Sequence, residues 1–199
     1  MRLLLWAAVF FGVLTWSAIR PADPVTWWLE VAPALIGFAI LWLTRRRFPL
    51  TQLVYVLILV HAVILMVGGH YTYAEVPVGD WLRDLLGGGR NNYDKLGHLA
   101  QGFIPAMIAR EILIRNGVVA VKGWLSTLVV CVVLAISAFY ELIEWWAALI
   151  SAEGADAFLG TQGYVWDTQS DMAWALGGAV LALLTLSRIQ DRQIKQLAG

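Results

Sequence analysis

Charged residues are scarce in this chain of 199 residues, at 14% of the sequence against 60% hydrophobic residues. Soluble globular domains carry roughly 25% charged residues, so the composition excludes an ordinary water-soluble domain. The formal net charge is zero, so nothing in the charge balance suggests nucleic-acid binding, and we expect no nucleic-acid partner. Cysteine occurs once, as Cys131 within an apolar run, and this excludes a disulfide within the chain.

The motifs of several enzyme classes are missing as well. The sequence contains no nucleophile motif, Walker loop or nucleotide-binding fingerprint. We therefore assign no catalytic residue, and the sequence leaves open whether the protein is an enzyme.

Long apolar runs, in contrast, nearly fill the chain. A hydrocarbon core about 30 Å thick needs roughly 20 mainly apolar residues per helix. Six segments fit this length, namely Leu3–Ile19, Trp27–Thr44, Leu50–Gly69, Asp94–Ile114, Lys122–Ile150 and Asp167–Arg188. We predict an all-α fold, a polytopic membrane bundle of about six transmembrane helices that forms one domain over residues 1–199 and has the lipid bilayer as its surroundings.

The first segment has a second interpretation. Met1 and Arg2 precede an apolar stretch that ends in Trp16-Ser17-Ala18, as in a cleaved signal peptide. The small-residue cleavage pattern is poor, and cleavage would leave the orientation of the later helices unchanged.

The positive charges of the short loops predict the orientation in the membrane. Lysine and arginine favour the cytoplasmic side, and residues 45–47 are three consecutive arginines between the second and third segments. The same side receives Arg2, Arg115, Lys122, Arg188, Arg192 and Lys195. The opposite loops receive the acids Asp23, Glu30, Glu75, Asp80, Asp84, Glu153 and Asp156. We predict a bacterial inner-membrane protein with both termini in the cytoplasm.

Aromatic side chains are expected at both membrane boundaries, where a large ring can lie in lipid while its polar atom stays wet. Tyr73 and Trp145 map to the outer boundary under this topology, and Trp124 maps to the inner one.

This topology brings scattered ionisable residues to the outer end of the bundle. Asp94 and His98 are four apart on one helical face, and Glu141 and Glu144 are three apart on the next helix. A carboxylate at mid-membrane costs about 2.5–3.5 kcal/mol on insertion scales, so these acids need a partner. Histidine with carboxylates is a ligand set for a divalent metal, and helical bundles build such sites at this spacing. The candidate metal ligands are Asp94, His98, Glu141, Glu144, Asp167 and Asp171.

Each candidate also has a structural interpretation. Asp94 and Asp167 stand where helices begin, and acids there cap free N–H groups. Asp94 can also pair with Lys95 or Arg90, and a lone His98 is more often a hydrogen-bonded interior residue than a ligand. Glu141 is the hardest to explain without a ligand.

The connection from His70 to Tyr93 is long for a helical bundle and holds two arginines beside a glycine run. Connections of this length are often lids or binding loops, and arginines can hold a phosphate. A plain flexible connection explains it equally well. The candidate substrate-binding residues are His70, Arg83, Arg90, Gln101, Gln162 and Gln169.

The last helix repeats small residues at spacing four: Ala173 with Gly177, Ala175 with Ala179, and Gly178 with Ala182. We predict close helix packing along this stripe. His61 lies in the third segment with no acidic neighbour in sequence, and we interpret it as a core histidine.

Four stretches of the chain carry a family resemblance, at residues 70–74, 91–98, 139–145 and 160–172. At these motifs, which read HYTYA, NNYDKLGH, FYELIEW and GTQGYVWDTQSDM, the chain resembles the YjdF-like family of bacterial inner-membrane proteins. The resemblance covers nearly the whole chain and implies a multi-pass inner-membrane protein, but it implies no particular activity.

A weaker likeness runs to VanZ-like membrane proteins. These have an Asp-Lys-x-x-His helix start, here at Asp94, a later buried acid, here Glu141 or Glu144, and a final helix with an Asp, here Asp171. The sequence departs from that pattern at Ala175, where a VanZ-like helix often has Asn. The likeness implies a location in the cell envelope more than a reaction.

Three functions of different classes fit these features. In the first, the cluster binds zinc, magnesium or manganese and holds, or acts on, a polar lipid headgroup or envelope precursor from the outer leaflet. In the second, Glu141 and Glu144 exchange protons and His98 relays them in a small transporter or permease. Against the second, ionisable residues stop in the outer half of the bundle, and no internal repeat is evident. In the third, the protein is an assembly factor and the polar network only fixes helix packing.

Overall fold

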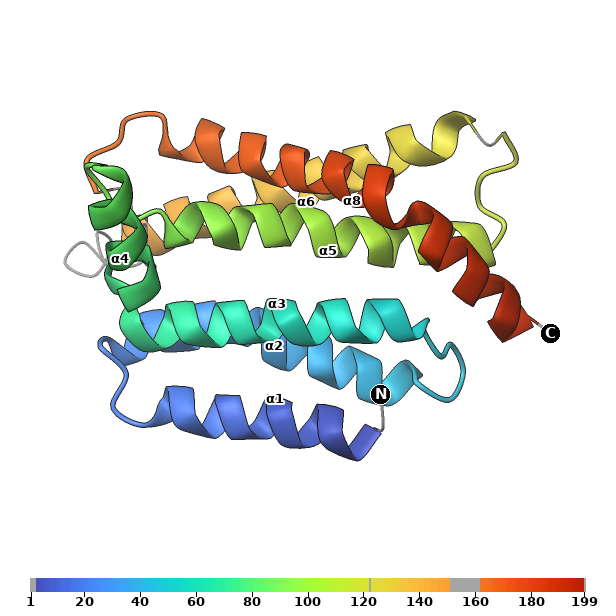
Figure 1. The fold of residues 1–199 in the computed structure, drawn as a ribbon, viewed down its shortest axis with the longest axis horizontal. Coiled ribbons are helices and arrows are strands. Elements are labelled where there is room, and N and C mark those ends of the chain that lie inside the picture. Colours follow the sequence, from blue (N-terminus) through green and yellow to red (C-terminus); the bar gives the residue numbers. More distant parts are fainter. Residues whose placement is uncertain (1–2, 122, 151–161, 199) are drawn as a thin grey trace.

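A computed structural model describes residues 3–121, 123–150 and 162–198, and these residues are helical with short connections. The elements are α1 (Leu3–Ala18), α2 (Pro24–Thr44), α3 (Gln52–Tyr71), the short 3-10 helix η1 (Tyr73–Glu75), α4 (Pro77–Leu86), α5 (Tyr93–Arg115), α6 (Gly123–Ile150) and α8 (Asp167–Ala198). The long helices lie side by side, with α4 across one end and both chain termini toward the other (Figure 1). We call these the α4 end and the termini end.

The six expected helices are all present, so the all-helical bundle is confirmed. Helices α2, α3, α6 and α8 are each long and apolar enough to cross a membrane, and α1 is apolar but shorter. The last helix extends ten residues beyond the expected end at Arg188, to Ala198. The orientation signals at Arg2, Lys122, Glu153 and Asp156 lie outside the described residues.

The connection between α3 and α5 is folded rather than irregular, because it contains η1 and α4. Pro77 lies in the first turn of α4, where its missing N–H does no harm, and Gly87 ends that helix at φ 68°. Asn91 is fully buried, and its amide donates to the carbonyl oxygen of Val76 at 2.9 Å. A side chain at Gly79 would collide with Asn91, so α4 is held tightly over this end of the bundle.

Two apolar cores meet at α3. In the first, Trp6 and Phe10 of α1 pack with Val31 of α2 and Met66 of α3, and the indole N–H of Trp6 donates to the carbonyl oxygen of Tyr55 at 2.8 Å. The second core joins α3 to α5, α6 and α8. Helix α3 contacts both α2 and α5, whereas α2 and α5 share no extended contact within the described residues.

The closest helix pair is α5 and α8, as the small-residue stripe predicts. A Cβ at Gly178 would lie 2.2 Å from the backbone oxygen of Leu99, and one at Gly102 would overlap the backbone of Ala175. Ala175 and Ala179 are fully buried. This close approach fixes the register of α8 against α5, and the register places the first turns of both helices at the α4 end.

A second polar network lies at the termini end and corrects one expectation. Glu111 of α5 is fully buried and accepts hydrogen bonds from the Thr51 hydroxyl at 2.6 Å and from Arg115 at 3.0 Å. Arg110 donates to Gln190 of α8 at 2.9 Å. The expectation that ionisable residues stop in the outer half is therefore wrong. These groups escape notice in the sequence because they lie near the end of α5, where charges usually reach water.

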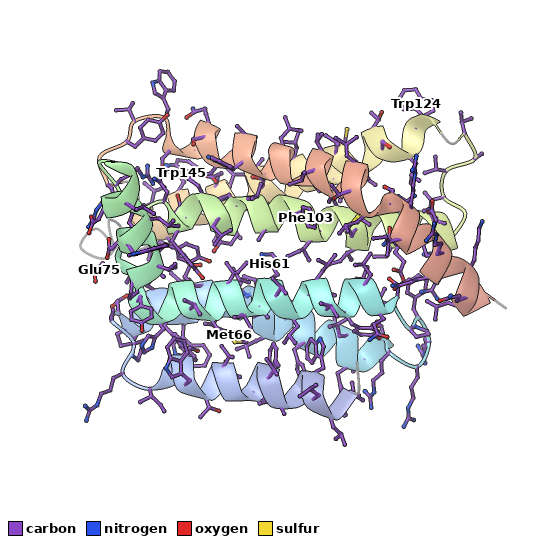
Figure 2. The ribbon with its side chains drawn as sticks, in the orientation of Figure 1. His61, Met66, Glu75, Phe103, Trp124 and Trp145 are labelled. Atoms are coloured by element: carbon purple, nitrogen blue, oxygen red, sulfur yellow. The ribbon has the colours of Figure 1, made fainter. Side chains whose placement is uncertain are left out.

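The expected aromatic boundaries are only partly present. Trp124 and Trp145 lie near opposite ends of α6 (Figure 2) and are 60% and 55% exposed. Tyr73, in contrast, is 8% exposed, so its ring lies within the protein rather than in lipid. Its ring fills the space above two glycines, Gly68 of α3 and Gly97 of α5.

Candidate metal and headgroup site

The first turns of α5 supply the centre of the site. Asp94, Lys95, His98 and Gln101 occupy one stretch of this helix, and all four are buried. The start of α5 is fixed by Asn91, whose side-chain oxygen accepts from the backbone N–H of Tyr93 at 3.0 Å. Four polar residues in two turns are tolerated because each has a charged or hydrogen-bonding partner. Asp94 and Gln101 find theirs on α5 itself or just before it, whereas Lys95 and His98 also meet acids of neighbouring helices.

Lys95 joins the beginnings of α5 and α8. Its Nζ lies 2.8 Å from Oδ1 of Asp167, 2.5 Å from Oδ1 of Asp171 and 3.3 Å from Oδ2 of Asp94. Arg90 also donates to Asp167, at 2.8 Å. Asp167 therefore has two cationic partners, and three aspartates share two permanent positive charges.

His98 stands between this aspartate group and a group of glutamates. Its Nε2 lies 3.2 Å from Oδ1 of Asp94 and 3.9 Å from Oδ2 of Asp171. On the other side of the ring, Nδ1 lies 2.9 Å from Oε1 of Gln101 and 3.9 Å from Oε1 of Glu141. The imidazole is thus within reach of acids from α5, α6 and α8.

The glutamate side contains no lysine or arginine in ion-pair contact within the described residues. Glu141 is 8% exposed, and its Oε1 has no hydrogen-bond partner. Glu144 lies one turn further along α6, and one of its carboxylate oxygens lies within 4.8 Å of a ring nitrogen of His98 and of a carboxylate oxygen of Glu141. A buried carboxylate oxygen without a donor is expensive, so this side requires a proton or a cation.

Glu30 belongs to the same region, and sequence reasoning missed it. It was assigned to an outward loop, but it lies within α2, is 4% exposed and accepts from the Tyr140 hydroxyl at 3.1 Å. The available signal was an acid about two turns into an apolar helix. Its position close to the expected start of the second segment, at Trp27, concealed that signal.

A cavity of about 130 Å³ lies among these groups. Its polar lining consists of Glu30, His61, Tyr73, Asp94, His98, Gln101, Tyr140 and Glu144. We call it the headgroup pocket. Burial raises the pKa of the Tyr73 phenol well above its usual value, so the Tyr73 hydroxyl stays protonated and can act as a donor here.

His61 is therefore more than an interior residue of α3. Figure 2 shows it in the space between α3 and α5, and it lines the headgroup pocket together with residues of α5. Its interpretation as a plain core histidine is incomplete, because the sequence carries no sign of a cavity beside it.

Two groups of donor atoms are close enough to share a metal ion. Atoms from Asp94, His98 and Asp171 lie within 4.8 Å of one another, and so do atoms from His98, Glu141 and Glu144. Ligands bound to one ion at 2.0–2.2 Å lie roughly 3–4 Å apart, so small side-chain rotations would close either group. Lys95 already occupies the first group, whereas the second has only His98 beside its two acids.

The remaining sequence candidates lie outside this centre. His70 donates a hydrogen bond from Nδ1 to the carbonyl oxygen of Ser17 at 3.0 Å, and its ring lies tilted against that of Trp16, with the ring centroids 4.5 Å apart. Arg83 pairs with Asp80 and Asp84 on the surface of α4. Gln162 exchanges two hydrogen bonds with the backbone of Asn91, at 3.0 and 2.9 Å. Gln169 is exposed.

Fold and site together define a multi-pass helical membrane protein with a buried polar centre at one end. The family model described as "Predicted membrane protein (DUF2238)" matches residues 2–192, and the chain belongs to this family. It is 54% identical over 184 residues, 92% of this chain and 88% of the relative, to "Inner membrane protein YjdF" of Escherichia coli (strain K12). No solved structure matches. The YjdF-like resemblance is confirmed, and the weaker VanZ-like likeness finds no support in these comparisons.

Proposed function

We propose that the protein binds one divalent cation between His98, Glu141 and Glu144, and that this cation holds the polar headgroup of a lipid or envelope precursor in the headgroup pocket. The observation that carries the proposal is the Oε1 atom of Glu141, which is buried without a hydrogen-bond donor and 3.9 Å from the His98 ring. A cation bound there would neutralise the negative charge on this oxygen. It would also offset the repulsion between the carboxylates of Glu141 and Glu144.

The overall charge of the centre supports a cation. Six carboxyl groups converge here, from Glu30, Asp94, Glu141, Glu144, Asp167 and Asp171, against two permanent cations, Lys95 and Arg90. Both permanent cations lie on the aspartate side. A cation on the glutamate side would balance these acids, and His98 is the one nitrogen ligand in the donor group there among the described residues.

The donor set favours particular metals. One imidazole with two carboxylates suits zinc or manganese, whereas magnesium prefers oxygen ligands and keeps several waters. The positive charge of the metal would bind a phosphate or another anionic group of the lipid headgroup. Tyr73 and Tyr140 would supply hydroxyl groups to the same pocket.

The assembly-factor alternative is favoured by the completeness of the Lys95 network, where the acids of α5 and α8 have cationic partners. It leaves Glu141 unexplained. The transporter alternative needs a polar path toward the termini end. The neighbouring cavity on that side is lined almost entirely by apolar residues, which argues against proton transfer along it.

Metal analysis of the purified protein tests the proposal. After extraction in mild detergent, we expect about one zinc or manganese ion per chain by inductively coupled plasma mass spectrometry. Glu141→Gln and His98→Gln should lose it. Glu111→Gln, which alters a buried acid at the opposite end, and Glu75→Gln, which alters an exposed acid near the site, should keep it. Metal-free wild-type protein that binds no added zinc or manganese would refute the proposal.

We further propose that the α4 end faces the periplasm and that both termini lie in the cytoplasm. The arginines at 45–47 and Arg115 lie at the termini end of α2 and α5, as expected for cytoplasmic loops. A C-terminal green fluorescent protein fusion should fluoresce and a C-terminal alkaline phosphatase fusion should be inactive. The reverse pair of results would invert the topology.

A further inference from the structure

A second, larger cavity of about 460 Å³ adjoins the headgroup pocket. Its walls come from α2 and α5 and its floor from α3. The two cavities share three lining residues, Pro33, His61 and Leu65. The two cavities are therefore neighbours, with the side chains of these three residues lining both. We call the larger cavity the apolar hollow.

The lining of the apolar hollow suits a hydrocarbon chain. Apart from His61 near the headgroup pocket and Thr44 and Asn116 at the far end, its lining side chains carry no polar atom. Its volume falls within the roughly 300–1,000 Å³ range of small-molecule sites. An empty apolar space of this size is unfavourable, because the lining atoms lose their dispersion contacts.

The hollow opens toward the membrane rather than toward water. Ile40 of α2 and Ile112 of α5 line it and are 55% and 43% exposed, so they mark its mouth between two helices that share no extended contact in the described residues. Because α2 is long and apolar enough to span the bilayer, this mouth faces lipid chains. Pro33 and Pro105 face the headgroup pocket from opposite walls, and proline inside a helix removes a backbone hydrogen bond and promotes a bend.

The length of the hollow matches one leaflet. Along α2 it extends from Pro33 to Thr44, the half of this helix at the termini end, which at about 1.5 Å per residue is roughly 16 Å. A chain in the hollow therefore lies in the leaflet at the termini end, with its headgroup near the middle of the bilayer. Half of a hydrocarbon core about 30 Å thick is roughly 15 Å. A glycerophospholipid acyl chain spans one leaflet, whereas a polyprenyl carrier is much longer than the hollow.

We propose that the apolar hollow holds one acyl chain of a glycerophospholipid whose headgroup lies in the headgroup pocket. This inference rests on the proposed function and names its substrate class. The cation binds the headgroup of the lipid, and α2, α3 and α5 surround its acyl chain.

Two glycines offer a matched pair of variants for the test. A Cβ at Gly37, which lines the hollow, meets no atom within 4 Å, and neither does a Cβ at Gly12 on α1. Gly37→Phe should therefore fill the hollow without a backbone collision, while Gly12→Phe adds the same ring elsewhere. Gly37→Leu provides a smaller obstruction, and circular dichroism with gel filtration checks that each variant is folded.

The probe is a phosphatidylethanolamine with a photoactivatable diazirine in the middle of one acyl chain, carried in vesicles of phosphatidylethanolamine and phosphatidylglycerol. After irradiation, mass spectrometry should find label enriched on the α2 and α5 peptides that line the hollow. Labelling of these peptides should fall severalfold in Gly37→Phe, less in Gly37→Leu, and stay at the wild-type level in Gly12→Phe.

Equal labelling of wild type and folded Gly37→Phe, or label spread evenly over all lipid-facing helices, would overturn the inference. Displacement of the acyl label by a polyprenyl phosphate but not by unlabelled phospholipid would also overturn it. Metal content measured on the same samples separates the two proposals. If the hollow is labelled but no metal is bound, the acyl-chain proposal stands and the cation proposal is refuted. If metal is bound but the hollow is not labelled, the cation proposal stands and the acyl-chain proposal is refuted.

Discussion

The Nζ atom of Lys95 lies 2.5 Å from Oδ1 of Asp171, and this pair divides the polar centre into two chemically different sides. On the aspartate side, lysine already supplies the positive charge that a metal ion would bring. On the glutamate side, no lysine or arginine within the described residues plays that role. The division explains why a metal is expected beside Glu141 and not beside Asp171.

Loss of Lys95 should destabilise the protein strongly. Lys95→Met leaves Asp171 buried without its cation, and breaking a buried ion pair on one side costs about 3–5 kcal/mol. The double variant Lys95→Met with Asp171→Asn should recover most of this loss, because Asp94 and Asp167 then share Arg90 and the net charge of the group returns to its wild-type value. Unfolding in detergent micelles measures the effect. The exposed Lys195→Met is the control and should change stability by less than about 0.5 kcal/mol; a Lys95→Met variant as stable as this control would contradict the account.

Adjacent glycines in α8 should respond in opposite directions to the same substitution. Gly178→Ala places a methyl group 2.2 Å from the backbone oxygen of Leu99, and overpacking of this kind costs about 1–3 kcal/mol. Gly177→Ala meets no atom within 4 Å and should be neutral or stabilise by up to about 1 kcal/mol, because alanine favours the helix. Thermal unfolding of the two variants in one detergent makes the comparison, and equal midpoints would show that α5 and α8 are not packed this closely.

The fold could be predicted from the sequence to a large extent, because α2, α3, α6 and α8 are each specified by their own apolar length. The bounds of α2, α3 and α5 fall within a few residues of expectation. Helix α4 was missed because an amphipathic helix of ten residues is too short to give a membrane-spanning signal, and its place depends on the buried side chain of Asn91.

The site was predictable only in part. The spacing of Asp94 with His98 and of Glu141 with Glu144 indicated shared helix faces, and the structure brings these residues together. Glu30 and His61 were missed because only the packing of α2 and α3 brings them to the pocket. The partners of Gln162 and His70 are backbone carbonyl and amide groups, and no sequence pattern encodes such contacts.

Substitution of Glu141 should stabilise the metal-free protein. Glu141→Leu removes a buried carboxylate that lacks a hydrogen-bond partner at Oε1, and replacing such a group by an apolar side chain is often neutral or stabilising. Added zinc or manganese should raise the wild-type stability by about 2.7 kcal/mol at a concentration 100 times the dissociation constant, and should leave Glu141→Leu unchanged. Equal metal-dependent shifts in the two proteins would place the cation elsewhere.

The start of α2 should show a local pH dependence. Asp23 caps this helix by accepting from the backbone N–H of Thr26 at 2.7 Å, and this hydrogen bond lowers the pKa of the Asp23 carboxyl below its ordinary value of 3.8. The stability that the ionised Asp23 cap adds to the folded protein is therefore fully present above the ordinary pKa of 3.8. This added stability is lost as the pH falls through the lowered pKa.

Asp23→Ala should cost about 1 kcal/mol at neutral pH, and its difference from wild type should shrink in acid. Asp23→Asn, which keeps an oxygen acceptor but cannot ionise, is the control. Unfolding measured across the acidic range in detergent checks both variants. A difference between wild type and Asp23→Ala that stays constant from neutral pH to below the ordinary pKa would be inconsistent with this cap.

The most direct test of the central claim is pulsed electron paramagnetic resonance of the protein loaded with Mn²⁺. A cation held by His98, Glu141 and Glu144 should show coupling to one imidazole nitrogen, and that coupling should disappear in His98→Gln while His61→Gln retains it. A spectrum without nitrogen coupling, matching Mn²⁺ in water, would contradict the cation site on which the proposed function depends.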